Sequence, residues 1–170
     1  MSRLYLFGVL MAVAGSAAAQ TTWRGLRFGM TEAEARTQLG NDAKRPSGLG
    51  AESNSKSEVY TGWLVSLELQ HIPGEARIGF DKKAHRCAGI YIELDPTKII
   101  DGIEKQVSVK LLLESLENKY GHPFRIEDGV QGSKTITWRT SDQIVEYHCI
   151  SVEGVPHLII IRYEPKTKDL

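Results

Sequence analysis

A chain of 170 residues, 41% of them hydrophobic, is long enough to bury a core, so we expect one globular domain. Lysine and arginine balance aspartate and glutamate, 21 against 21, which gives a formal net charge of zero. This balance supplies no electrostatic attraction for nucleic acid or for an anionic membrane surface, so we expect neither as a partner.

The first 19 residues have the pattern of a secretory signal peptide. Arg3 supplies a positive n-region, residues 4–14 form an apolar stretch, and the alanines at 17–19 form a small-residue cleavage site. The apolar stretch is too short to span a membrane. We therefore predict cleavage between Ala19 and Gln20, which leaves a periplasmic or secreted protein without a membrane anchor.

The stretch from Phe28 to Gly40 predicts a short capped helix. Thr31 and Glu34 have the spacing of a capping box, and Gly40 can adopt the left-handed conformation that ends a helix. We expect the helix to cover about residues 32–39. Acidic residues in its first turn would repel an anion, so we interpret the stretch as structural rather than as a binding site.

A loop and three strands are expected next. Residues 41–57 are rich in glycine, serine and asparagine, which predicts a loop. Alternating apolar and polar residues then predict three strands, and the short turns between them indicate an antiparallel meander. These strands cover about residues 63–70, 76–81 and 87–94.

A second helix is expected from Val109 to Tyr120, where apolar residues recur at helical spacing. Ser108 is the predicted N-cap and Gly121 the predicted stop. A loop at 125–133 precedes three further strands and a charged tail that we expect to be disordered. The strands cover about residues 136–138, 143–152 and 158–163, and the tail covers residues 166–170.

The order helix, loop and three strands thus occurs twice, which we interpret as a degenerate internal duplication. The predicted fold is α+β, with tandem α-β-β-β units whose antiparallel sheet packs against the helices. We expect a single domain at 20–165, made of two repeats at about 23–95 and 107–164.

Cys87 and Cys149 are the only cysteines, and both lie in predicted strands. An even count in an oxidising compartment favours a disulfide, which would close a loop of about sixty residues and stabilise the fold by roughly 4 kcal/mol. His85 and His148 lie close to the cysteines in sequence, so a zinc site is the alternative. Adjacent strand residues point to opposite faces, which disfavours zinc. We predict a disulfide, no metal and no other cofactor.

Four aromatic residues in predicted strands are the candidate binding residues. Those on a sheet face left open by the helices would form a platform for a protein partner or a hydrophobic ligand. The alternative is that they pack in the core, as aromatic residues in strands commonly do. The four residues are Tyr91, Trp138, Tyr147 and Tyr163.

A secretory leader followed by Phe-Gly-Met-Thr-x-x-x-Ala-x-x-x-Leu-Gly at 28–40 resembles small bacterial periplasmic α+β repeat domains. These include the outer-membrane assembly lipoprotein family and the β-lactamase-inhibitor-protein-like family. The resemblance implies helices packed on an antiparallel sheet, no enzymatic activity and a protein partner. The chain departs from the assembly lipoproteins because no lipidation cysteine follows the cleavage region.

No Gly-x-Ser-x-Gly, His-Glu-x-x-His or phosphate-loop motif occurs in the sequence. We therefore expect an exported, non-enzymatic binding or interaction protein of the bacterial envelope, with a protein partner in the periplasm or envelope. The alternative is a small-ligand carrier, or a hydrolase whose site is assembled from scattered residues. An open aromatic sheet face would favour the first, and a closed cavity with convergent histidines and carboxylates would favour the second.

Overall fold

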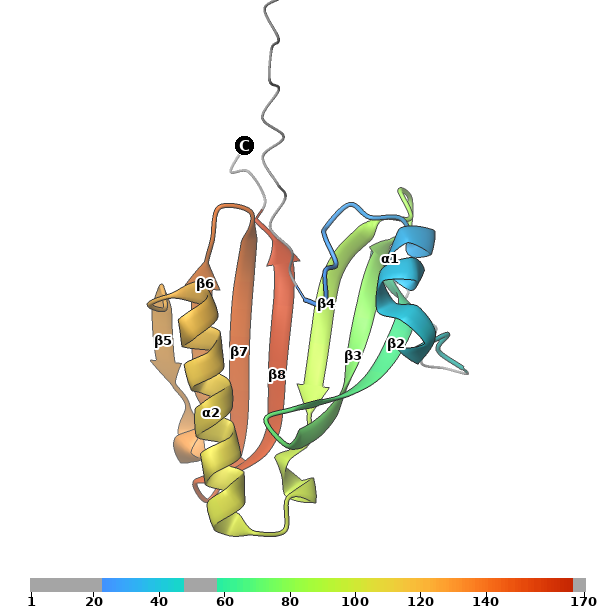
Figure 1. Ribbon diagram of the computed structural model, residues 1–170. Helices are drawn as coiled ribbons and strands as arrows, with labels where there is room; N and C mark the ends of the chain where they lie inside the picture. Colours follow the sequence, from blue (N-terminus) through green and yellow to red (C-terminus); the bar gives the residue numbers. More distant parts are fainter. Residues whose placement is uncertain (1–22, 48–57, 167–170) are drawn as a thin grey trace, which may run out of the picture.

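The computed structural model describes residues 23–47 and 58–166 (Figure 1). The predicted signal peptide lies outside the described residues, as do most of the loop predicted at 41–57 and most of the tail predicted at 166–170. Within the two described stretches, no helix combines the length and the apolar character that crossing a membrane requires.

The first helix, α1 (Glu32–Leu39), confirms the capped helix predicted from the sequence. The Glu34 amide donates to the Thr31 hydroxyl at 3.3 Å, and the Glu34 carboxylate accepts from the Thr31 amide at 2.8 Å. Gly40 ends the helix with a φ of 69° and starts the short 3-10 helix η1 (Gly40–Asp42). Ala35 and Leu39 are buried, so α1 has one side for docking on the sheet.

The second helix, α2 (Gly102–Tyr120), begins two turns earlier than predicted, after the 3-10 helix η3 (Pro96–Lys98). Its N-cap is Asp101, whose carboxylate accepts from the amides of residues 103 and 104 at 2.8 and 2.9 Å. Ser108, the predicted cap, is buried inside the helix. The first turns carry exposed apolar residues, so the core-facing periodicity begins only at Val109. Gly121 ends the helix as predicted.

Within residues 23–47 and 58–166, eight strands form a single antiparallel sheet in the order β1-β2-β3-β4-β8-β7-β6-β5. In the first half the strands are β1 (Ala43–Lys44), β2 (Val59–Leu69), β3 (Ile72–Asp81) and β4 (Cys87–Leu94). In the second half they are β5 (Arg125–Asp128), β6 (Lys134–Arg139), β7 (Gln143–Val152) and β8 (Val155–Pro165), with the 3-10 helix η4 (Val130–Gly132) after β5.

Two strands, β1 and β5, lie where the sequence predicts loops. Both are short outer strands of the sheet, of 2 and 4 residues. Neither contains a run of alternating apolar residues, because an outer strand of this kind buries little of its surface. Each half of the sheet therefore contains four strands rather than the three predicted. The observed class is α+β, with one antiparallel sheet and two α-helices in the described residues.

Both α-helices lie on the same face of the sheet, in front of it in Figure 1. Side chains on this covered face form the core, and one buried row crosses six strands through directly paired residues. The row consists of Trp63, Ile78, Ile90, Tyr163, Val145 and Trp138. No helix of the described residues lies on the opposite face, which we call the open face. Its side chains are the alternate residues of the same strands.

Candidate functional site

Three of the four candidate aromatic residues lie on the covered face rather than the open one. Trp138, Tyr147 and Tyr163 are only 0%, 1% and 3% exposed. The ring of Tyr120, at the end of α2, packs on Trp138 and Tyr163 with centroids 6.4 and 6.3 Å apart. Burial raises the pKa values of Tyr147 and Tyr163, as expected of phenols in a core. Only Tyr91 can contribute to a binding surface on the open face.

The predicted disulfide between Cys87 and Cys149 is absent, and both residues are buried free thiols. Leu94 pairs with Ile159, which pairs with Cys149, so Cys149 lies level with the end of β4. Cys87 lies at the start of β4, a strand length away, or about 23 Å at about 3.3 Å per residue. A disulfide requires Cα atoms within about 7 Å. The same separation rules out a single zinc site built from both cysteines.

Tyr91 lies at the centre of a row of paired residues that crosses the open face. Arg77 on β3 pairs with Tyr91 on β4, and Tyr91 pairs with Arg162 on β8. The row continues to Leu64 on β2 and to Glu146 on β7. The Arg162 guanidinium carbon lies 5.9 Å from the centre of the Tyr91 ring. An aromatic ring between two guanidinium groups therefore occupies the middle of this face.

Four glutamates, one of them in the same row, form ion pairs with the two arginines. Arg77 contacts Glu75 at 3.3 Å and Glu93 at 3.6 Å, both through guanidinium nitrogens. Arg162 contacts Glu146 at 3.6 Å and Glu164 at 3.7 Å. None of these ion pairs is bidentate, and an arginine has five N–H donors. Donors therefore remain for a further acceptor on the open face.

A hollow of about 670 Å³ lies beside this row. Its lining includes Thr61, Gly79 and Gly89 from three neighbouring strands, together with the arginines and tyrosine of the row. Gly79 and Gly89 are directly paired. A Cβ atom added at Gly89 would have no neighbour nearer than the Tyr163 carbonyl oxygen at 3.5 Å. The missing side chain therefore leaves space that an incoming group can fill.

A second polar group on the open face contains His148. Its Nδ1 lies 3.1 Å from the Thr135 hydroxyl and its Nε2 lies 3.4 Å from the Glu146 carboxylate. Hydroxyl, imidazole and carboxylate are the groups of a hydrolytic triad. Here Thr135 and His148 are direct cross-strand neighbours, and β6 and β7 each pair with strands on both sides. The sheet ladder engages their main-chain N–H groups, which leaves no pair of donors to stabilise an oxyanion.

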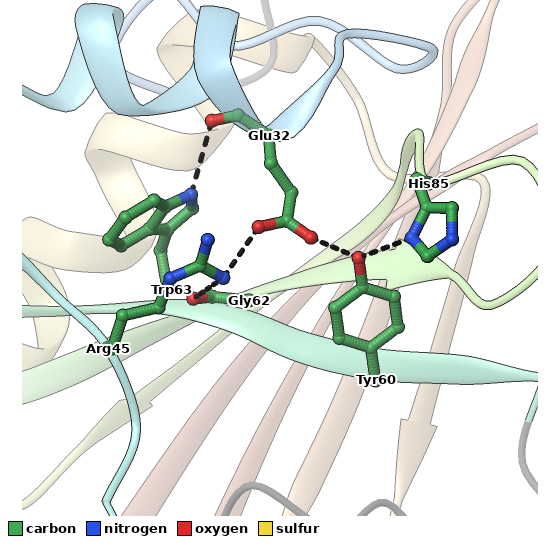
Figure 2. Close-up of polar contacts among 6 residues, drawn as sticks. All are labelled: Glu32, Arg45, Tyr60, Gly62, Trp63 and His85. Carbon is green, nitrogen blue, oxygen red and sulfur yellow. Dashed lines mark hydrogen bonds and ion pairs between the residues drawn. The ribbon is translucent and has the colours of Figure 1, made fainter.

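The densest polar cluster lies on the covered face, where α1 meets β2 (Figure 2). Glu32, the first residue of α1, accepts a hydrogen bond from the Tyr60 hydroxyl and lies 2.5 Å from Arg45. The Tyr60 oxygen lies 3.0 Å from Nδ1 of His85. Because an ionised carboxylate can only accept, the Tyr60 hydroxyl donates its hydrogen bond to Glu32. The Tyr60 oxygen is then the acceptor for His85, which donates from Nδ1.

Trp63 supports the same cluster. Its indole N–H donates to the main-chain oxygen of Glu32 at 3.2 Å, and the Arg45 guanidinium carbon lies 4.1 Å from the centre of its ring. Arg45 also donates to the main-chain oxygen of Gly62 at 3.2 Å. Figure 2 shows Trp63 of β2 at the main-chain oxygen of Glu32, and Arg45, from the segment after β1, at its carboxylate. The cluster attaches α1 to the sheet.

The pKa values of Glu32 and Tyr60 are shifted in opposite directions, which determines the protonation state of each side chain. Burial on its own raises the pKa of Glu32, but hydrogen bonds from Tyr60 and Arg45 and the positive charge of Arg45 outweigh it, so the pKa is lowered. Burial first, and then the hydrogen bond to Glu32, raises the pKa of Tyr60 to about 12. The pair is therefore a carboxylate and a neutral phenol at neutral pH. Its contacts are made within the cluster, so we interpret it as structural.

Sequence reasoning missed the arginines and glutamate of the open-face row, and it missed the Glu32–Tyr60–His85 contact. Alternation along each strand indicates which residues share a face, but it does not reveal which residues of different strands are paired. Comparison of the chain with family models, with curated proteins and with solved structures gave no match.

Proposed function

We propose that this chain is an exported, non-enzymatic binding protein of the bacterial envelope that holds a protein partner on the open face of its sheet. The observation that carries the proposal is the row Arg77–Tyr91–Arg162, which lies on a face without a described helix. Tyrosine and arginine are enriched at protein interfaces and at the residues that contribute most to binding.

The breadth of the site supports a protein partner rather than a small ligand. The arginines beside the hollow have side chains that are 47% and 42% exposed. Small-molecule sites typically bury 70–90% of the ligand surface, which requires walls on several sides. A hollow on an open sheet face instead suits one side chain of a larger partner whose other contacts spread over the neighbouring strands.

The arrangement of the two halves supports the proposed tandem repeat at about 23–95 and 107–164. In each half one α-helix precedes four strands, and the halves meet where β4 pairs with β8. A tandem arrangement of this kind is also what the resemblance to periplasmic α+β repeat domains implies. Members of those families bind protein partners, which agrees with the function proposed here.

The hydrolase alternative is supported by the contact of Thr135 with His148 and of His148 with Glu146. A sheet surface without oxyanion donors accounts for these contacts more simply as cross-strand packing. We therefore favour binding over catalysis.

The experiment compares capture of envelope proteins by the immobilised mature chain and by the variant Tyr91→Ala. A partner held on the open face is expected to be retained by the wild type and lost from Tyr91→Ala. The variant Phe124→Ala is the control, because Phe124 is an aromatic side chain, 60% exposed, outside this row. Equal capture by all three proteins, or by none, would contradict the proposal.

A further inference from the structure

The open face is complementary to itself, and we propose that the partner it holds is a second copy of this chain. The two copies pack sheet against sheet about a two-fold axis that runs parallel to the strands, between β4 and β8. This inference rests on the proposed function, since it names the partner of the same surface.

The position of the axis determines which strands face each other. A two-fold axis along the strands between β4 and β8 places β4 of one copy over β8 of the other, β3 over β7 and β2 over β6. Rotation about this axis keeps each residue at its level along the strands. Residues of one cross-strand row therefore face residues of the same row in the second copy, which is the isologous contact of a symmetric dimer.

The central row brings opposite charges together under this arrangement. Because the row runs Arg77–Tyr91–Arg162–Glu146, Arg77 faces Glu146 of the second copy, and Tyr91 faces its Arg162. The first contact is an ion pair and the second is a cation–π contact. Each contact occurs twice, since the dimer is symmetric.

The next row is also compatible. It runs Ser66–Glu75–Glu93–Ile160–His148–Thr135, so Glu75 faces an imidazole, Glu93 faces an isoleucine and Ser66 faces a threonine. In these two rows, no like charges oppose each other across the six strands from β2 to β6. Like charges meet only at the outer edges, where Lys44 faces Arg125. Packed sheets cross at about 30°, which separates their outer corners.

The row on the other side borders the hollow. Gly79 pairs with Gly89, and Ile144 pairs with Glu164. Extending the register of β4 and β8 by one residue places Gly89 beside Glu164, so these four residues form one row. Ile144 of the second copy then faces Gly79, at the hollow of about 670 Å³. The Val59 side chain already lies over Gly79, since a Cβ atom there would be 2.7 Å from its Cγ1. Ile144 therefore packs against Val59 at the edge of the hollow, and the open space at Gly89 faces Glu164 of the second copy.

Other positions of the two-fold axis bring like charges together in the central row. An axis through β4 would oppose Arg77 to Arg162 of the second copy, and an axis through β8 would oppose Arg162 to itself. Six strands about 4.8 Å apart and about eight residues long cover roughly 760 Å². This approaches the roughly 800 Å² per partner of a standard stable interface.

The test exchanges the charges of one contact. The variant Arg77→Glu opposes two carboxylates and the variant Glu146→Arg opposes two guanidinium groups, so each variant should dimerise at least about tenfold more weakly than the wild type. An equimolar mixture of the two should recover dimers, because the heterodimer pairs the introduced glutamate with the introduced arginine at one position and keeps the native Arg77–Glu146 pair at the symmetry-related one. Sedimentation velocity of the mature chain at micromolar concentrations measures each state.

The mixture also controls for folding, because it contains the same two chains that fail to associate alone. The variant Lys110→Glu breaks a 3.7 Å ion pair with Glu114 on α2, away from the open face, and should leave the dimer unchanged. A monomeric wild type, or a mixture that stays monomeric, overturns the inference. If the monomer still captures another protein in a Tyr91-dependent way, the proposed function stands and only the second copy is rejected.

Discussion

The hydroxyl of Tyr60 donates a hydrogen bond to the carboxylate of Glu32, and so connects the first residue of α1 to β2. These residues are 28 positions apart in the sequence. A helix of 8 residues is marginal alone, because helix nucleation costs more than two turns of hydrogen bonds return. The contact therefore stabilises α1 through the sheet.

Substituting Glu32→Gln should lower the free energy of unfolding by about 1–2 kcal/mol, since hydrogen bonds to charged groups contribute about 1.5–3 kcal/mol. Glutamine keeps the shape of the side chain and removes the charge that pairs with Arg45. Urea unfolding measures the change. The control is Glu58→Gln, whose side chain is 81% exposed and should change stability little. Equal losses in both variants would contradict the structural role of Glu32.

Acid should weaken the fold through the same carboxylate. The pKa of Glu32 is lowered from its ordinary value of 4.5, so the folded state holds fewer protons than the unfolded state at this site. Its contribution is present above pH 4.5 and is lost as the pH falls through the folded-state pKa. Urea midpoints measured between neutral and acidic pH should fall less steeply for Glu32→Gln than for the wild type. Identical slopes would show that Glu32 is not linked to folding.

High pH should lower the stability of the fold through ionisation of Tyr60. Its pKa is raised to about 12 from 10.0, so between these values the unfolded chain loses a proton that the folded chain keeps. Stability should therefore decline as the pH rises through this range. Absorbance of phenolate, compared between the wild type and Tyr60→Phe, isolates the titration of this side chain. An ionisation of Tyr60 close to 10 would be inconsistent with the hydrogen bond to Glu32.

The two sides of α2 should respond differently to shortened side chains. Leu116 is 6% exposed and faces the sheet, whereas Leu111 is 40% exposed on the same helix. Leu116→Ala should cost about 2–4 kcal/mol in the free energy of unfolding, and Leu111→Ala less than about 1 kcal/mol. Thermal or urea unfolding of both variants gives the comparison. A larger loss of stability for Leu111→Ala than for Leu116→Ala would contradict the assignment of the Leu116 side of α2 to the core.

Alanine substitutions at two glycines should have opposite effects on stability, one through steric crowding in the sheet and the other through helix propensity. A Cβ atom at Gly74 would lie 2.2 Å from the main-chain oxygen of Glu93, whereas one at Gly102 would meet nothing within 4 Å. Gly74→Ala should therefore destabilise the sheet by at least about 2 kcal/mol. Gly102→Ala should be neutral or stabilise α2 by up to about 1 kcal/mol. Far-UV circular dichroism during urea unfolding reports both, and equal effects would contradict the close approach of β3 to β4.

The features predicted correctly from the sequence are those set by neighbouring residues. The Thr31–Glu34 box acts over one helical turn, so it is visible in the sequence, whereas the Asp101 cap went unrecognised because the turns after it are exposed. The face on which Trp138 lies stayed open between platform and core, because alternation groups residues without identifying which side the helices cover. The prediction of a disulfide was wrong because β8, which pairs with both β4 and β7, sets the register that places Cys149 level with Leu94. This register cannot be seen in the sequence.

The pairing of β4 with β8 has a consequence for how the chain is made. The strand that joins the two halves of the sheet is synthesised after the other seven described strands, so β4 lacks its second neighbour until residues 155–165 have emerged. Edge strands with unpaired main-chain groups are prone to pair with other chains. A chain that lost β8 by truncation would expose β4 and β7 together, so a premature stop late in translation should produce aggregates rather than a stable half-protein.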